Sequence, residues 1–572
     1  MLVKLYFLKL AWGNLKRNRR TFVPYILATS IISGVFLLIS GLLFSDGLKN
    51  VPGGETARSV FSFGIVMFAI FAFFFMVYIN NFIVGRRKKE FGLYGILGLE
   101  RRHVGRVLVW ENGITLLAGV LLGALTALVF GRLLFLALLK LIHAAPGSTF
   151  SIAPIAFALT GGLFFCVFVL TSLLNLRQVR LKSPMELLKS ERKGQKDSKL
   201  LVPLAVLGAI LLAAAYYFAW TTQNRGMALG IFFPLSILVI IATELLFNSG
   251  SIAALRALRA NKRVYYKPGN FIAISGMFQR MRQSAKSLAT ICILSTMFLV
   301  TISGTLSLYL GQENILKASH VYDVSLRIDK TIAEGNIRSF EQSLLSLASK
   351  HDVRLHATKD KLTYEQASDG TEPTGLRYVP KNAEIIKLDT LLCIDHMMLF
   401  DVDGTDQNCI SFVQDARTHY LSTFPEKSLS SNNVFEARRN GYATYGGLLF
   451  LGAFFGILFL SVTVLIIYFK QVSEGYEDKE QFAILQKVGM DDAQVKSTIN
   501  TQVLWVFFIP LGMTILHMLF ASKIMAVMLE SFMLYDWGLV LACIGGSSVL
   551  FAVLYLVVYK LTAHVYYRIV KW

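Results

Sequence analysis

The chain contains ten runs of about 20 apolar residues, and this pattern constrains its fold more than any other feature. A run of that length crosses a bilayer as one α-helix. The ten runs lie at approximately Phe22–Phe44, Val60–Val84, Ile114–Leu138, Ile155–Leu174, Leu200–Trp220, Ala228–Phe247, Leu288–Leu310, Thr444–Tyr468, Val503–Phe520 and Leu539–Tyr559. Charged residues make up only 16% of the chain, against about 25% in soluble proteins. The sequence therefore predicts an α-helical polytopic membrane protein and excludes a soluble enzyme.

Lysine and arginine are distributed unevenly among the connecting segments. The segment before the first run is strongly basic, as are the connections after the second, fourth and sixth runs. The stretch 256–286 has eight Lys or Arg and no Asp or Glu, whereas the alternate connections are nearly bare. Basic loops stay on the cytoplasmic face. We therefore expect both termini in the cytoplasm, and the net charge of +21 indicates membrane lipid rather than nucleic acid as the partner.

Residues 311–440 interrupt the apolar pattern and carry 15 Lys or Arg against 19 Asp or Glu. The predicted topology places this inserted domain outside the membrane. Residues 322–328 alternate polar and apolar side chains as a half-buried strand does, and 337–350 has the spacing of a helix, so we expect a small α+β domain. Its two cysteines, Cys393 and Cys409, could form a disulfide outside the cell. Two free buried thiols are the plainer expectation, because pairing geometry cannot be read from sequence.

The sequence is internally duplicated. Residues 90–104, after the second run, resemble residues 481–495, after the eighth, at an offset of 391. Residues 14–20 resemble residues 278–284 more weakly, at an offset of 264. The difference between the offsets is close to the size of the inserted domain. We therefore predict two four-span units, the second carrying an insertion after its first helix, with spans 5 and 6 joining them.

The predicted organisation has six parts. They are 1–20, an amphipathic cytoplasmic helix; 21–190, the first four-span unit with a first coupling segment at 86–104; 191–265, a linker with spans 5 and 6; 266–310, a second basic helix and span 7; 311–440, the extracellular domain; and 441–572, spans 8–10 with a second coupling segment at 477–495.

Each coupling segment reads as a short helix ended by glycine, Gly98 or Gly489, followed by a turn and a new helix. The first has an apolar side formed by Phe91, Leu93, Tyr94 and Leu97. Such a side could dock in a groove on a partner or merely lie on lipid. Its presence twice, at corresponding positions, favours docking.

Three motifs resemble the FtsX-like permeases of ABC transporters. They are residues 86–98 (RRKKEFGLYGILG), 11–20 (AWGNLKRNRR) and 183–188 (SPMELL). Ten spans with one exterior domain between spans 7 and 8 resemble the Bce-type branch, the antimicrobial-peptide (bacitracin) resistance permeases of Gram-positive bacteria. The resemblance implies a permease of the bacterial cell membrane that detoxifies or senses peptide antibiotics and couples ATP hydrolysis to motion of the exterior domain.

The resemblance also implies partners. These are a cytoplasmic ABC ATPase in two copies, which would hold the ATP and Mg, a membrane histidine kinase, and a peptide antibiotic or lipid-linked cell-wall intermediate. The residues expected to couple to the ATPase are Glu90, Phe91, Leu93, Tyr94, Leu97, Gly98, Phe482, Ile484, Leu485 and Gly489.

The chain itself lacks the motifs of an enzyme. It has no Gly-Lys dipeptide for a phosphate-binding loop, no His-Glu pair for a zinc helix and no C-x-x-C. We expect no catalytic residue, cofactor or metal in this chain.

Ionisable residues near the spans are the remaining candidates for function. Glu111 lies near the start of span 3, where pairing with a loop arginine is plausible, and its counterpart in the second unit is Gln502. Arg132 and Lys140 near the outer end of span 3 could contact anionic lipid head groups or simply extend to the interface.

Two alternatives remain open. An FtsX-like mechanotransmitter for lipoprotein release or cell-wall hydrolase control would share the same membrane domain. An ion-driven secondary transporter would need interrupted helices and acids within the membrane, which the spans almost lack.

Overall fold

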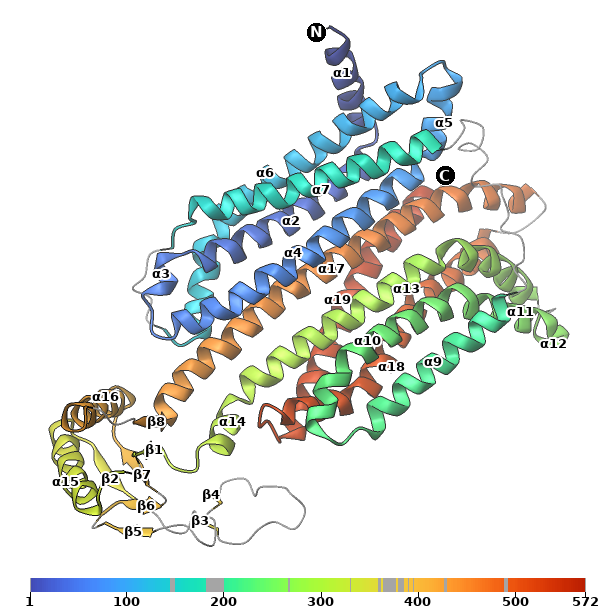
Figure 1. Ribbon diagram of the computed structural model, residues 1–572. Coiled ribbons are helices and arrows are strands. Elements are labelled where there is room, and N and C mark those ends of the chain that lie inside the picture. Colours follow the sequence, from blue (N-terminus) through green and yellow to red (C-terminus); the bar gives the residue numbers. More distant parts are fainter. Residues whose placement is uncertain are drawn as a thin grey trace.

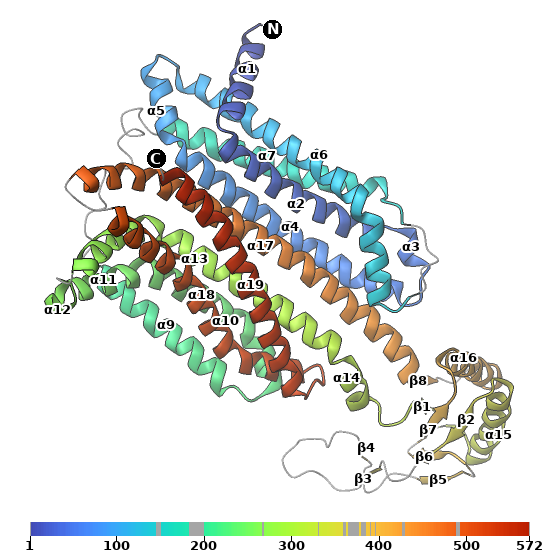
Figure 2. The same ribbon diagram turned by 180° about the vertical axis from the view of Figure 1, so that it is seen from behind.

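The computed structural model describes residues 2–144, 150–181, 200–265, 268–329, 331–357, 362–363, 377–378, 385–388, 390–394, 396–425, 429–487 and 492–570. Ten of its helices are long and apolar enough to cross a membrane, which confirms the predicted number of spans. Figures 1 and 2 show these helices side by side, with the two chain termini at one end and the inserted domain at the other.

The first part of the chain forms a four-helix bundle with short helices at its ends. Its elements are α1 (Leu2–Arg17), α2 (Arg19–Leu43), α3 (Asp46–Lys49), α4 (Gly54–Arg86), α5 (Lys88–Ile96), α6 (Arg101–Leu141) and α7 (Pro154–Leu181). The long helices α2, α4, α6 and α7 are the first four spans, and α1 packs against α6.

The helices outside the first bundle and the inserted domain form a second bundle beside the first. They are α9 (Leu201–Thr221), α10 (Arg225–Leu245), the π-helical turn η1 (Leu246–Gly250), α11 (Ser251–Ala260), α12 (Lys262–Tyr265), α13 (Pro268–Leu310), α17 (Val434–Lys487), α18 (Asp492–Glu530) and α19 (Trp537–Val570). The linking spans α9 and α10 pack on the outside of this bundle, against α18.

Helices α2 and α6 approach closely because small residues line their contact. A Cβ atom on Gly123 of α6 would lie 2.1 Å from the Ser33 hydroxyl oxygen and 2.6 Å from the Ser30 carbonyl oxygen of α2. The Ser33 hydroxyl also donates a hydrogen bond to the Gly119 carbonyl, at 3.3 Å. In a bilayer, helix association depends on close packing rather than on a hydrophobic driving force, which explains small residues at such a contact.

Phenylalanine side chains join the two bundles along α4 and α17. The Phe68 and Phe455 ring centroids are 5.4 Å apart, and Phe71 meets Phe459 edge to face at 5.7 Å. Such edge-to-face pairs are favourable because the positive ring edge faces the negative ring face. Phe68 and Phe459 are 391 residues apart, which is the offset between the two units. The helices that carry them, α4 and α17, are therefore equivalent helices of the two units.

The inserted domain has helices on one side of a small sheet (Figure 1). Its elements are α14 (Gln312–Ser319), β1 (Val324–Arg327), α15 (Glu334–Lys350), β2 (Arg354–His356), β3 (Leu362–Thr363), β4 (Arg377–Tyr378), β5 (Ile385–Lys387), β6 (Leu392–Ile394), β7 (Met397–Asp403), α16 (Asp406–Thr423) and β8 (Ser430–Asn433). The strand order is β5-β6-β7-β1-β8, with β2 also pairing with β7 and β3 with β4 separately. Val324 lies opposite Phe400 in the antiparallel β1–β7 pair. The α+β prediction is confirmed.

The two cysteines of this domain are both buried thiols. Cys393 lies on β6 and Cys409 on α16, so the disulfide that the sequence allowed does not form between these two described residues. Both side chains belong to the hydrophobic core between sheet and helices. Burial, together with the negative charges of Asp406 and Asp323, raises the pKa of Cys409 to about 11.

Candidate coupling site

Helix α5 forms the first coupling segment at the end of the molecule opposite the inserted domain. It ends in a Schellman motif. Gly98 has the left-handed φ of +93°, its N–H donates to the Gly95 carbonyl at 3.4 Å, and the Leu99 N–H donates to the Tyr94 carbonyl at 3.0 Å. Helix α6 then begins at Arg101. The predicted helix, glycine turn and new helix are confirmed for this segment.

The apolar residues of α5 do not share one face, contrary to the sequence prediction. Phe91 is only 4% exposed and packs with Val84, Val104 and Leu108 of the flanking helices, while Tyr94 is half-buried beside it. The helical spacing of three residues between Phe91 and Tyr94 turns both toward the bundle. Phe91 therefore attaches α5 to the bundle and is not available for docking in this structure.

Three other apolar side chains, on α5 and on the residue that directly follows it, are free for a partner. Leu93 is 50% exposed and Leu97 is 71% exposed, and Ile96, which the sequence analysis did not select, is 60% exposed. Because α5 lies beyond the last residue of the second span, Gly85, these side chains lie beyond the spanning part of the chain. Exposed apolar side chains at such a position are candidates for a protein contact.

A buried ion pair fixes the start of α5 to α6. Arg87 caps both α4 and α5, and its Nη1 lies 2.5 Å and its Nη2 3.1 Å from the two carboxylate oxygens of Glu111. The two side chains are 6% and 3% exposed. A bidentate arginine–carboxylate pair fixes both the distance between the two side chains and their relative orientation. The predicted pairing of Glu111 with a loop arginine is confirmed.

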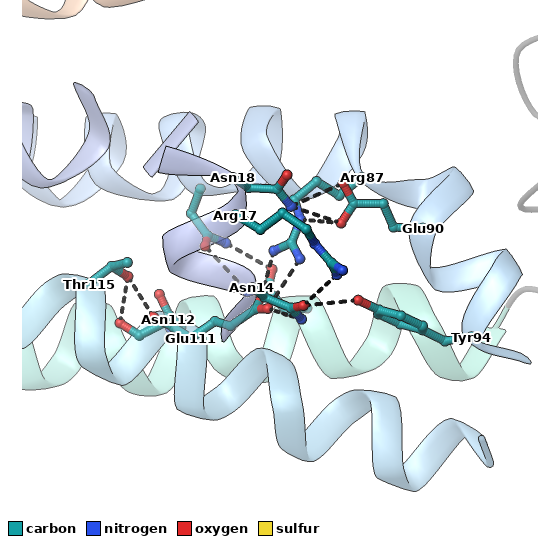
Figure 3. A network of polar contacts seen from close by, with 11 residues as sticks. Asn14, Arg17, Asn18, Arg87, Glu90, Tyr94, Glu111, Asn112 and Thr115 are labelled. Atoms are coloured by element: carbon teal, nitrogen blue, oxygen red, sulfur yellow. Dashed lines mark hydrogen bonds and ion pairs between the residues drawn. The ribbon is translucent and has the colours of Figure 1, made fainter. Parts of the chain in front are cut away.

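The ion pair is the centre of a wider polar network that includes α1 (Figure 3). Asn14 donates from Nδ2 to Glu111 at 2.9 Å and accepts from the Tyr94 hydroxyl at 3.2 Å. Glu90 accepts from Arg87 Nε at 2.9 Å and from Asn18 Nδ2 at 3.2 Å. Side chains from α1, the α1–α2 junction, α5 and α6 therefore meet at one point.

Aromatic rings complete the surroundings of Arg87. Its guanidinium carbon lies 5.0 Å from the ring centre of Phe22 and 5.3 Å from that of Phe91. Burial by itself lowers the pKa of Arg87, but hydrogen bonds and negative charge from Glu111 and Glu90 outweigh this, so its pKa lies above the usual value. Arg87 therefore stays charged at every physiological pH.

The second coupling segment has a different construction. Helix α17 continues without a break from Val434 to Lys487, 54 residues in all. Phe482, Ile484 and Leu485 lie on this helix, but their side chains, like Gly489, lie outside the described part of the structure. The positions corresponding to Arg87 and Glu111 are Asp478 and Gln502, which cannot form an arginine–carboxylate pair.

Other polar side chains occupy the end of α17 that lies farther from the inserted domain (Figure 1). Glu474 accepts a hydrogen bond from the Ser284 hydroxyl of α13 at 2.7 Å and lies 3.8 Å from the ammonium group of Lys470. Glu474 and Lys470 are both buried. Tyr476 accepts a hydrogen bond from Arg20, which links α17 to α2 of the first unit. The two units are thus connected at this end of the molecule.

The predicted lipid-contact residues lie in the C-terminal part of α6. Arg132 and Lys140 are both exposed, which suits lipid contact and simple extension to the interface equally well.

Sequence reasoning missed Asn14, Asn18 and the special role of Arg87. Arg87 lies in a run of four basic residues, 86–89, and composition alone does not separate it from its neighbours. The available signal was Glu111, because a carboxylate at the start of a membrane span needs a partner of opposite charge.

Two parts of the chain, residues 62–184 and 453–566, match the model of the FtsX-like permease C-terminal family. They begin 391 residues apart, the offset that relates the two coupling segments. The chain carries two FtsX-like permease domains. This permease is 23% identical to the ABC transporter permease YvcS of Bacillus subtilis (strain 168), over 98% of this chain and 99% of that protein.

Two further relatives come from the same organism. The ABC transporter permease protein YxdM is 21% identical, over 91% of this chain and 94% of its own length. The bacitracin export permease protein BceB is 20% identical, over 91% of this chain and 95% of its own length. The permease therefore stands among the permease subunits of ABC transporters, and its ten spans make it a multi-pass membrane protein.

Proposed function

We propose that this permease transmits ATP hydrolysis by a separate cytoplasmic ATPase to its inserted domain outside the cell, and so removes or senses peptide antibiotics at the bacterial envelope. The observation that carries the proposal is the surface of α5, where Leu93, Ile96 and Leu97 are exposed on a helix that the buried Arg87–Glu111 pair attaches to the bundle. An exposed apolar surface on a firmly attached helix suits a partner that exerts force.

Two ATPase copies suit a chain with two coupling segments, and ATP and Mg would belong to those copies. The positive-inside distribution supports cytoplasmic coupling segments and termini. The peptide role rests on the similarity to the bacitracin export permease BceB. A lipid-linked cell-wall intermediate is the alternative ligand, and a membrane histidine kinase would be a further partner if the complex serves as a sensor.

The first test is purification of the full chain from its host in detergent, with identification of the ATPase that accompanies it. We expect the wild type and the control Leu258→Asp, which charges an exposed leucine on α11, to retain the ATPase. The double variant Leu93→Asp/Leu97→Asp should lose most of it, because charges oppose burial of an apolar contact. Absence of any ATPase with the wild type would contradict the proposal. Stimulation of the wild-type complex by bacitracin would support the peptide role.

A further inference from the structure

We propose that Arg87 is a positioning residue that joins the first coupling segment to α6, and that force reaches the bundle through this joint in the first unit alone. The inference rests on the proposed function, because it takes an ATPase to act on α5. It concerns a residue that has almost no exposed surface to offer the ATPase, since only 6% of the Arg87 side chain is accessible.

The position of Arg87 makes relative motion of α5 and α6 costly. It lies at the break between α4 and α5, and its guanidinium is shared by Glu90 on α5 and Glu111 on α6. Separating a buried, hydrogen-bonded pair leaves both charges without compensation in a medium of low polarity. When α5 is displaced, α6 therefore moves with it. The ion pair holds the two helices together, and Asn14 of α1 bridges them through its hydrogen bonds to Tyr94 of α5 and Glu111 of α6.

Helix α6 leads from this joint to the base of the inserted domain. It is a single helix of 41 residues that ends at Leu141. There the Tyr309 hydroxyl of α13 donates to the Leu141 carbonyl at 3.2 Å, and the ring of His143 lies 4.0 Å from that of Tyr442 on α17. These contacts connect the far end of α6 to both helices that carry the inserted domain.

Hydrogen bonds at the base of the inserted domain link α17 to α14. Tyr442 donates a hydrogen bond to Glu313 of α14 at 3.4 Å, and Arg438 of α17 donates to the same carboxylate at 3.1 Å. A displacement of α6 thus reaches the chain segments on both sides of the inserted domain. Side-chain contacts of this kind can carry coupling between distant sites, and the claim of a path requires a direct coupling measurement.

The second unit offers a different route. Its positions for the ion pair are Asp478 and Gln502, whereas α17 itself runs from the second coupling segment to the base of the domain without a break. In the first unit the coupling helix α5 is separate from α4, so it needs the ion pair to transmit its motion to the bundle. In the second unit the coupling segment belongs to the continuous helix α17. The two ATPase positions are mechanically different even if the two ATPase copies are identical.

The test uses the complex of the full chain with the ATPase that accompanies it. We compare wild type, Arg87→Gln, Glu111→Gln, the double variant and the control Arg102→Gln, which removes a charge of the same segment from an exposed ion pair with Glu100. We measure the amount of bound ATPase, the melting temperature, and kcat and KM for ATP.

We expect each single variant to lower kcat about tenfold, the scale of coupling changes along such networks. The bound ATPase and KM should stay unchanged, because α5 keeps its exposed leucines and ATP binds to the other chain. The double variant should be no worse than either single variant, because both remove the same contact. The control Arg102→Gln should match the wild type.

An unchanged or raised kcat, additive losses in the double variant, or loss of the bound ATPase itself would overturn the inference. Absence of an ATPase from the wild type would instead overturn the proposed function, so the two failures are distinguishable. If Arg87→Gln does not fold, Arg87→Lys replaces it, because lysine keeps the charge but not the two-pronged geometry. Full kcat in Arg87→Lys would equally overturn the inference.

Discussion

At the scale of single residues, the Arg87–Glu111 pair is buried, so we expect the loss of one partner to cost more than the intact pair contributes. A buried ion pair gives little net stability compared with apolar residues of the same volume, because both charges lose their hydration. Removal of one partner is different, since it leaves the other charge buried and uncompensated. Asn14 supplies an additional hydrogen bond to Glu111, which helps to offset the cost of burying the carboxylate.

The first prediction concerns this pair. Glu111→Ala should destabilise the folded protein by about 3–5 kcal/mol, because Arg87 then remains buried without its main counter-charge. The exposed pair partner Glu100 offers the control, and Glu100→Ala should leave the melting temperature of the detergent-solubilised protein unchanged. Equal effects of the two variants would show that burial of the first pair has no energetic consequence.

A second residue prediction concerns Cys409. Its folded-state pKa of about 11 exceeds the value of about 8.5 for a free cysteine, so the folded domain holds the neutral thiol. Stability from this group is complete below about pH 8.5 and is lost as the pH rises toward 11, because the unfolded chain ionises first. Iodoacetamide at pH 8 should modify Cys409 slowly in the folded protein and rapidly in denaturant. Rapid modification of the native protein would contradict the buried placement.

At the scale of helices and strands, the sequence predicted which helices are present better than which side of a helix faces the bundle. Ten apolar runs and a glycine at position 98 were sufficient for ten spans and the end of α5, because both depend on local chain properties. Which side of α5 faces the bundle depends on tertiary contacts. The apolar residues Phe91 and Leu97 look alike in the sequence, yet one is 4% and the other 71% exposed.

The third prediction concerns the contact of α2 with α6. Gly123→Ala should destabilise the protein by about 1–3 kcal/mol, because the added methyl group meets a backbone carbonyl that cannot move aside. The matched control is Gly162→Ala on α7, where a Cβ would meet no atom within 4 Å. The control should be neutral or slightly stabilising, since alanine favours helix more than glycine does. The test is to measure the melting temperatures of both variants in one detergent. Equal melting temperatures would contradict the close packing of α2 against α6 at Gly123.

At the scale of the whole molecule, the duplication explains why two bundles meet through equivalent helices α4 and α17. The offset of 391 residues was readable from two short motifs, and it makes Phe68 of α4 the equivalent of Phe459 of α17. Both residues contribute to the phenylalanine contacts between these helices. The difference between the units was less accessible. The first unit has the basic residues 86–89 where the second has the mostly acidic residues 477–480. This charge difference is visible in the sequence, but only the structure shows that the helix breaks between α4 and α5 and continues through α17.

The fourth prediction concerns orientation. A cysteine replacing Lys350, an exposed residue of α15, should react with a membrane-impermeant maleimide in intact cells, because the proposed topology places the inserted domain outside. A cysteine replacing Leu97 should react only after permeabilisation, because basic segments stay in the cytoplasm. The opposite pattern would invert the topology and remove the basis for a cytoplasmic ATPase at α5.

The most direct test of the account is whether nucleotide on the ATPase moves the inserted domain. Fluorophores would be attached at Lys350→Cys on α15 and Glu55→Cys at the outer end of α4, in the full complex with its ATPase. We predict that a non-hydrolysable ATP analogue changes the energy transfer between them, and that Arg87→Gln weakens this change while leaving the ATPase bound. An unchanged transfer efficiency in a complex that hydrolyses ATP would contradict the claim that this permease transmits motion across the membrane.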